Sequence, residues 1–211
     1  MIVIRTALGA LGVFCMLGVT GCSFVSAARE MAGAALEDRA HADLMRDTEI
    51  DSKLVRLINQ RYSGTTLDLS FDVWEQRVLV TGTVDTPTLR EEISRLVGTV
   101  PDVRATYYEV QPVSTEDKEQ RLREKEQGDQ KKNTGGAGEI IDDLWIAKKV
   151  EGQLLSGPGV RSINYRWRVV RRTLYIIGRA RSQTELDEVL RICRETKGVK
   201  EVKHFVEIKP V

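Results

Sequence analysis

The chain has few residues of the kinds that build metal centres and disulfide frameworks. Its 211 residues include three cysteines and two histidines, and tetrahedral zinc sites draw mainly on these two residue types. Neither sign of charge dominates, since 32 Lys and Arg stand against 31 Asp and Glu. The composition therefore argues against a metal site, a disulfide scaffold, and a chain that is polybasic or polyacidic throughout. Hydrophobic residues make up 41%, which is enough for a core, and the length allows one domain or two small ones.

The apolar run near the N-terminus is too short to cross a bilayer. Thr6–Thr20 is 15 residues without a charge, whereas a membrane-spanning helix needs about 20 apolar residues. One basic residue, Arg5, precedes it. The pattern predicts a secretory signal peptide over residues 1–21.

The end of this run resembles the lipobox of bacterial lipoproteins. Small residues in Val19-Thr20-Gly21 precede Cys22, the position that is acylated and becomes the N-terminus in such proteins. The resemblance implies a lipidated Cys22 followed by a tether over residues 22–46. Because Ser23 rather than Asp follows the cysteine, it also implies the outer membrane, on the periplasmic face. An ordinary signal peptide with an incidental cysteine is the alternative.

The rest of the chain contains an internal repeat. A shift of 96 residues, without a gap, aligns Asp47 with Asp143 and Gly82 with Gly178, and apolar positions stay in phase over the whole span. We therefore predict two copies of one small domain, at 47–113 and 142–211. Residues 114–141 form a linker whose first 25 residues include 12 charged ones and which ends rich in glycine, a composition unsuited to a core.

Each copy is predicted to fold in the order helix, strand, strand, helix, strand. In the first copy, apolar residues recur with helical spacing from Ile50 to Ile58 and alternate with polar ones from Leu67 to Val73. The fold class is thus α+β, with two αββαβ units, each a three-stranded sheet covered on one face by two helices. Gly82 and Gly178 are expected at the end of the second strand, where a side chain would crowd the sheet or the packed helix.

This plan resembles the BON domain, and two copies behind a lipobox are similar to the dual-BON outer-membrane lipoproteins of Gram-negative bacteria. The most similar segment is Trp145-Ile146, Lys149-Val150 and Gln153-Leu154-Leu155. The resemblance implies a protein that is not an enzyme, has no cofactor, and supports the integrity of the envelope. It also implies that the first helix of the second domain engages phospholipid.

The charge of the two copies points the same way. Residues 47–113 carry 7 basic against 11 acidic residues, a net −4, and residues 142–211 carry 15 against 9, a net +6. A cationic domain on an anchored protein is attracted to anionic headgroups. If Ile146, Val150 and Leu154 face the core, the outer face of that helix carries the predicted phospholipid-contact residues, which are Trp145, Lys148, Lys149 and Gly152. The alternative is that Trp145 packs into the core or against the other domain.

No catalytic, metal or small-molecule site emerges from the remaining residues. Arginines around Trp167, from Arg166 to Arg172, are expected on a solvated strand face and its hairpin turn, and a secreted protein does not meet nucleic acid. The acidic pairs Glu91-Glu92 and Asp187-Glu188 look like surface charge, and Cys193 like a small buried apolar residue.

Two function classes follow. The first is a lipid-anchored envelope protein that binds anionic phospholipid through its second domain. The alternative is a periplasmic adaptor whose acidic and basic domains dock on each other or on an envelope protein partner.

Overall fold

The computed structural model describes residues 37–62, 68–117, 119–120, 123 and 139–210, and the chain in it has two halves built on one plan. The first domain consists of α2 (His41–Arg61), β1 (Asp68–Trp74), β2 (Arg77–Val84), α3 (Pro87–Val97) and β3 (Ala105–Pro112). The second domain consists of α5 (Glu139–Ser156), the short 3-10 helix η1 (Ser162–Asn164), β4 (Tyr165–Val170), β5 (Thr173–Ala180), α6 (Gln183–Glu195) and β6 (Glu201–Ile208). The predicted αββαβ order is confirmed in both.

Each sheet is mixed and has its second strand in the centre. β1 runs antiparallel to β2, and β3 runs parallel to β2. β4, β5 and β6 repeat this arrangement. The register is the same as well, since Leu69 faces Gly82 in the first sheet and Tyr165 faces Gly178 in the second. Both glycines lie inside the central strand rather than at its end, two residues before its last residue.

Local signals in the sequence explain where the second helix of each domain begins. Thr86 accepts a hydrogen bond from the backbone N–H of Leu89, and Pro87 occupies the first turn of α3. Ser182 does the same for the N–H of Glu185 at the start of α6. Both are standard N-caps, which satisfy a backbone donor that the helix itself leaves free.

The two helices of each domain cover one face of its sheet and bury an apolar core against it. The core of the first domain includes Ile50, Leu54, Val78, Val80 and Ile93. The core of the second includes Ile146, Val150, Leu174, Ile176 and Val189. All five positions are equivalent under the 96-residue shift: 50 and 146, 54 and 150, 78 and 174, 80 and 176, 93 and 189.

The hairpin between the first two strands depends on a buried aspartate in the preceding helix. Glu75 and Gln76 have positive φ angles of 48° and 59°, as two-residue hairpins of this twist require, although Asn and Gly are the usual residues there. The carboxylate of Asp47 accepts the backbone N–H groups of both, at 2.6 and 2.7 Å. In the second domain Asp143 accepts those of Arg171 and Arg172, both at 2.8 Å. This repeated contact ties the first helix to the hairpin.

Residues 37–46 are part of the folded structure rather than of the expected tether. α2 begins at His41, six residues before the expected boundary at 47. The reason is Arg39, whose guanidinium lies 2.6 Å from Asp47 and packs over the ring of Trp74 at 4.4 Å. Glu37 completes this buried cluster with a 2.6 Å ion pair to Arg39.

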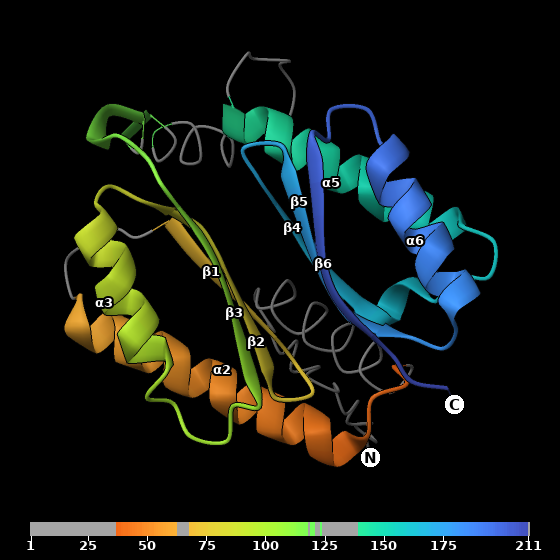
Figure 1. The fold of residues 1–211 in the computed structure, drawn as a ribbon, viewed down its shortest axis with the longest axis horizontal. Coiled ribbons are helices and arrows are strands. Elements are labelled where there is room, and N and C mark those ends of the chain that lie inside the picture. The colour runs from red at the N-terminus through yellow and green to blue at the C-terminus, as the bar shows by residue number, and fades with distance from the viewer. Residues whose placement is uncertain (1–36, 63–67, 118, 121–122, 124–138, 211) are drawn as a thin grey trace, which may run out of the picture.

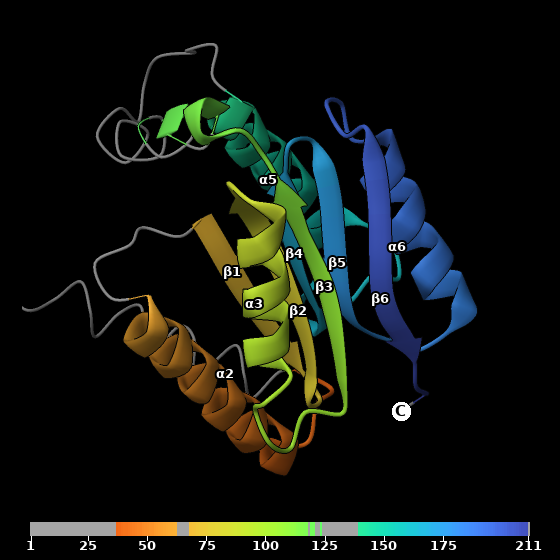
Figure 2. The same cartoon turned by 60° about the vertical axis from the view of Figure 1, so that its left-hand side comes forward.

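The two domains dock through the sheet faces that their own helices leave uncovered. Figures 1 and 2 show the two sheets side by side in the middle, with α2 and α3 outside one and α5 and α6 outside the other. The interface has an apolar centre made of Trp74, Leu79, Val170, Tyr175 and Ile177, with Tyr107 and Phe205 packed against it. The molecule is therefore a four-layer arrangement of helices, sheet, sheet and helices.

Candidate functional site

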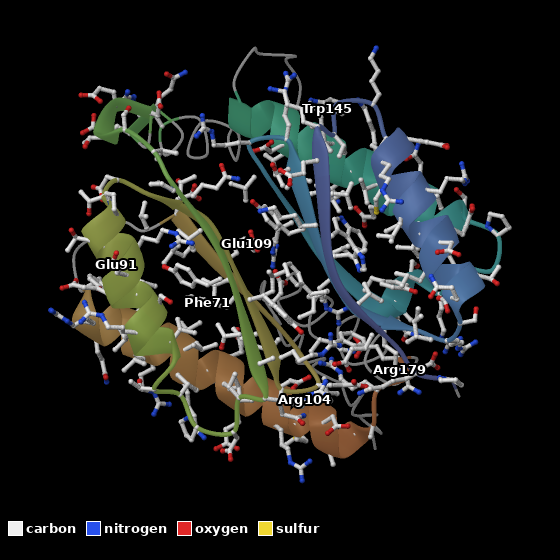
Figure 3. The ribbon with its side chains drawn as sticks, viewed as in Figure 1. Phe71, Glu91, Arg104, Glu109, Trp145 and Arg179 are labelled. Atoms are coloured by element: carbon white, nitrogen blue, oxygen red, sulfur yellow. The ribbon has the colours of Figure 1, made fainter. Side chains whose placement is uncertain are left out.

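The outer face of α5 is the most apolar exposed surface in the described part of the chain. Leu144, Trp145 and Leu155 are 55%, 60% and 69% exposed, and all three lie on this helix. Ile146, Val150 and Leu154 point the other way into the core. Trp145 thus does not pack into the core, and Figure 3 shows it on the outside of the second domain.

Lysines lie along the same face. Lys149 and Gly152 follow Trp145 at i+4 and i+7, which puts them on one side of the helix, and Lys148 lies beside them. Lys148 is 76% exposed and pairs with Glu151 at 2.7 Å. A surface pair of this kind is weak, typically about 0–1 kcal/mol, so the ammonium group can exchange Glu151 for another anion. Within the part of the chain that the structure describes, a Cβ added at Gly152 would meet no neighbouring atom within 4 Å.

Two neighbouring turns bring further basic residues to this end of the second domain. The hairpin residues Arg171 and Arg172 are held to α5 by Asp143. Lys200 donates its backbone N–H to the carbonyl oxygen of Arg172 at 2.9 Å. The turn before Lys200 packs on α5, since a Cβ at Gly198 would lie 2.8 Å from Ile146.

The equivalent helix of the first domain lacks these features. In α2, Glu49 and Lys53 stand where Trp145 and Lys149 stand in α5, and they form an exposed ion pair at 2.8 Å. Ser52 replaces Lys148 and Arg56 replaces Gly152. The aromatic and paired-lysine surface is therefore a property of the second domain alone.

The arginines of β4 are partly exposed, as expected, with 37% of the Arg166 side chain and 48% of the Arg168 side chain in solvent, but both also pair with acidic residues across the domain interface. Arg168 donates two hydrogen bonds to Asp72 of the first domain, at 2.8 and 3.1 Å. Arg166 pairs with Glu37 and lies over Trp74. The sequence could not show this, because alternation of polar and apolar residues does not say whether the polar face meets water or an oppositely charged sheet.

Most basic residues of β4, β5 and β6, and several that flank these strands, form ion pairs across the interface between the domains. Basic residues of the second domain form ion pairs with acidic residues of the first domain or of the segment just before it. These pairs are Arg179 and Lys209 with Glu75, Lys203 with Glu109, and Arg181 and Arg161 with Asp38. In the opposite direction, the buried guanidinium of Arg77 donates to the carbonyl oxygens of Phe205 and Gly178 at 2.6 and 2.8 Å. The net +6 of the second domain is thus largely matched at the interface, and the lysines of α5 lie outside it.

Residues 37–39, which we call the clasp, join the start of α2 to the second domain. Asp38 receives two hydrogen bonds from the Arg181 guanidinium, and one from Asn164 Nδ2 at 2.7 Å. These donors lower the pKa of Asp38 to about 2. The clasp cannot be recognised from the sequence, because a run of charged residues gives no sign of its partners.

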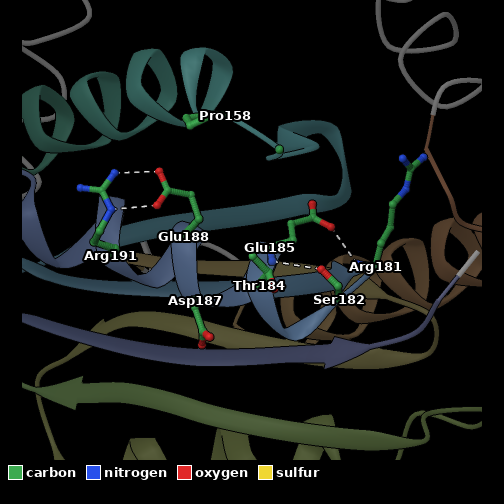
Figure 4. A pocket seen from close by; sticks show the side chains of 9 residues that line it. Pro158, Arg181, Ser182, Thr184, Glu185, Asp187, Glu188 and Arg191 are labelled. Atoms are coloured by element: carbon green, nitrogen blue, oxygen red, sulfur yellow. Dashed lines mark hydrogen bonds and ion pairs between the residues drawn. The ribbon is translucent and has the colours of Figure 1, made fainter.

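The described residues also form an open hollow of about 580 Å³ at the start of α6, shown in Figure 4. Its lining is Pro158, Gly159, Arg181, Ser182, Thr184, Glu185, Asp187, Glu188 and Arg191. The polar groups are engaged with one another: Glu188 binds Arg191 at 2.7 Å, and Glu185 accepts the backbone N–H groups of Arg161 and Arg181. The side chains around the hollow cap the start of α6 and pair with one another. Among the described residues that line it, no acid and base are placed together for catalysis.

Of the predictions for Cys193 and Cys22, only the one for Cys193 falls on residues that the structure describes. Cys193 is fully buried in α6, and burial raises the pKa of its thiol to about 12, so it is a small apolar core residue as expected. Cys22, the signal peptide and residues 22–36 lie outside the described residues.

The comparison with protein families matches the BON domain twice, at residues 46–111 and 142–210. The chain belongs to the BON-domain family. Two such domains suggest a membrane- or envelope-associated role, and BON domains are typically non-catalytic.

Individual proteins add little beyond the family. The chain is 29% identical over 146 residues to an uncharacterized protein of Anaplasma centrale from the gshII 5′ region, which covers 69% of this chain and 85% of that protein. Among solved structures, it matches CdsD, a structural protein of the type III secretion system of Chlamydia trachomatis, at 13% identity and a TM-score of 0.30, over 80% of this chain and 93% of that one. The C-terminal domain of CdsD matches at 12% identity and the same TM-score, over 82% and 100%.

Within the described residues, no helix combines the length and apolar character needed to cross a membrane.

Proposed function

We propose that this protein is a non-catalytic, lipid-anchored envelope protein that binds anionic phospholipid through the outer face of α5 and supports outer-membrane integrity. The observation that carries the proposal is the 60% exposure of Trp145 beside Lys148 and Lys149. An indole at the level of the headgroups, flanked by lysines that reach phosphate, is typical of interfacial membrane contacts.

The charge distribution supports this surface over the others. The basic residues of β4, β5 and β6 pair with acidic residues of the first domain or of residues 37–39, whereas Lys148 and Lys149 lie outside that interface on the same helix as the exposed Trp145. Basic residues close to an anionic surface contribute roughly 1 kcal/mol each. Binding through α5 would therefore not require the two domains to separate.

The anchor completes the proposal. Acylation of Cys22 on the periplasmic face of the outer membrane would hold the second domain near headgroups at all times. Two or three acyl chains anchor stably, whereas one chain binds only marginally.

Flotation of residues 23–211 with vesicles tests the phospholipid contact. We expect binding to vesicles that contain phosphatidylglycerol and little binding to pure phosphatidylcholine. Trp145→Glu should lower the partition coefficient about tenfold or more, because burying a large apolar side chain contributes roughly 1.5–3 kcal/mol and about 1.4 kcal/mol is tenfold. The thermal unfolding of the variant should stay close to that of the wild type.

Met45→Glu is the matched control, since Met45 is also 60% exposed but lies on α2. Replacing Lys148 and Lys149 by Glu should remove most of the salt dependence, because screening acts over about 8 Å at physiological ionic strength. The same reversal of Arg46 and Arg56 on α2 should change little. Unfolding of the Trp145 variant, or unchanged binding by all these variants, would contradict the proposal.

The lipid anchor has its own test. Replacing Cys22 by Ala should abolish labelling of the protein by radioactive palmitate and release it from the membrane fraction. Replacing Cys15, which lies within the predicted signal peptide, should leave the labelling intact. Persistent labelling without Cys22 would refute the assignment of the lipidation site.

The adaptor alternative keeps one observation in its favour, which is that the acidic and basic domains dock on each other. That contact occupies the charged surfaces the adaptor would offer to another protein. If flotation detects no vesicle binding in a folded protein, an envelope protein partner for the α5 surface becomes the better proposal.

A further inference from the structure

The contact between the two sheets is reciprocal. β2 packs against β4, and β1 packs against β5. The 96-residue shift converts β1 into β4 and β2 into β5, so it exchanges these two contacts with each other. The two domains are therefore related by a pseudo-two-fold axis that passes through the interface between the sheets (Figure 1).

One ion pair lies at this axis. Asp72 and Arg168 are equivalent positions, because they are separated by the 96 residues of the repeat, and they bind each other directly. In a two-fold interface only a residue close to the axis can contact its own equivalent. The Asp72 side chain is 6% exposed, so the pair is partly withdrawn from water and its charges are only partly screened.

The pseudo-two-fold axis also relates the positions of two other contacts between the domains to each other. The rings of Tyr107 and Phe205 stack with centroids 4.3 Å apart. Lys203 donates to Glu109 at 2.8 Å. Tyr107 is equivalent to Lys203, and Glu109 is equivalent to Phe205. The same pair of positions thus holds an aromatic stack on one side of the axis and an ion pair on the other.

A pair of identical domains would lose all three contacts. Two first domains in this geometry would place Asp72 against Asp72, and Tyr107 against Glu109 twice. Two second domains would place Arg168 against Arg168, and Lys203 against Phe205 twice. Like charges brought together in an interface cost several kcal/mol, and neither ring would keep its partner.

We infer that the sheet face of each domain is a heterotypic recognition surface, which accepts the domain of the other kind and rejects a copy of itself. Its partner is the other domain of the same chain. A second copy of the chain fits this surface only if the two chains exchange domains reciprocally, so that each interface again contains one domain of each kind. Repulsive elements of this sort are how specific interfaces exclude related partners.

The inference is tested by two complementary variants of residues 23–211. A positive variant carries Asp72→Arg and Glu109→Lys, and a negative variant carries Arg168→Asp and Lys203→Glu. Within either variant the two domains carry like charges at these positions. Between the variants every position is again complementary. We expect each variant alone to be a monomer with a lowered unfolding temperature, and an equimolar mixture to double in mass in light scattering after size exclusion.

Two further chains keep the result interpretable. The chain with all four substitutions restores both ion pairs with reversed polarity and should be a monomer that unfolds close to the wild type. A charge-matched control, with Glu49→Lys and Glu91→Lys on outer helices, should not associate with the negative variant. The inference is overturned if the mixture stays monomeric while the two variants unfold like the wild type. It is equally overturned if the chain with four substitutions is as unstable as the two chains with two substitutions, since opposite charges at these positions would then not stabilise the interface.

Discussion

At the two repeated glycines, the absence of a side chain is required by the neighbouring strand. A Cβ on Gly82 would lie 1.9 Å from the carbonyl oxygen of Asp68, and one on Gly178 would lie 2.2 Å from that of Asn164. Both contacts are with backbone, which cannot move aside as a flexible side chain could. Glycine is thus required at this position in both domains because the backbone at the start of the first strand passes so close to it.

Gly178→Ala should destabilise the second domain by about 3 kcal/mol or more. Overpacking costs roughly 1–3 kcal/mol, and a strained backbone conformation adds roughly 1–3 kcal/mol, with φ of 157° at this residue. Gly152→Ala is the control, because its Cβ meets nothing and alanine in a helix is favoured over glycine by roughly 0.5–1 kcal/mol. Urea unfolding measures both. An unchanged midpoint for Gly178→Ala would show that the sheet can accommodate a methyl group there.

Helices, strands and their order could be predicted from the sequence because they depend on local patterns. The helical stripe from Ile50 to Ile58 and the repeat register both appear in the structure. The second helices begin after Thr86 and Ser182, whose side chains are ordinary N-caps. The outer position of Trp145 followed from the helical phase of its neighbours in the same way.

The elements that the sequence concealed depend on partners distant in the chain. The repeat shows an aspartate at the same place in both copies, but the pattern does not show that it is buried or that Asp47 and Asp143 accept the hairpin N–H groups. The pairing of the β4 arginines with the first domain cannot be predicted from the sequence, because the alternation of polar and apolar residues along a strand does not show that the two sheets dock on each other. The start of α2 lies before the repeated region, and the pattern of the repeat does not show that Arg39 contacts Asp47 and Trp74.

Across the whole molecule, opposite net charges serve association of the two domains more than they serve a distant ligand. The interface combines a central apolar cluster with peripheral ion pairs, as stable protein interfaces do. The exposed charge that remains near Trp145 is accordingly a small part of the +6 counted from the sequence. The clasp extends this association to the segment that leads towards the predicted lipid anchor, so the anchor would be attached to both domains rather than to the first alone.

The clasp predicts a specific dependence of stability on pH. Hydrogen bonds from Arg181 and Asn164 lower the pKa of Asp38 to about 2, below the value near 3.9 of an unfolded chain. The unfolded state therefore takes up the proton first as the pH falls. Asp38 stabilises the folded state fully above about pH 5, and this contribution is lost as the pH falls from about 4 to about 2.

Asp38→Asn should lower the free energy of unfolding at pH 7 by about 1 kcal/mol, the scale of a partly exposed ion pair. The backbone contacts of residue 38 with Asn164 and Arg179 do not involve its own side chain, so the clasp can keep its path. Urea unfolding from pH 7 to pH 3 should show the difference from the wild type shrinking below about pH 4. Glu91→Gln, which removes an exposed carboxylate from α3, should show no such trend. A difference for Asp38→Asn that stays constant down to pH 3 would mean that the carboxylate charge of the clasp does not hold the two domains together.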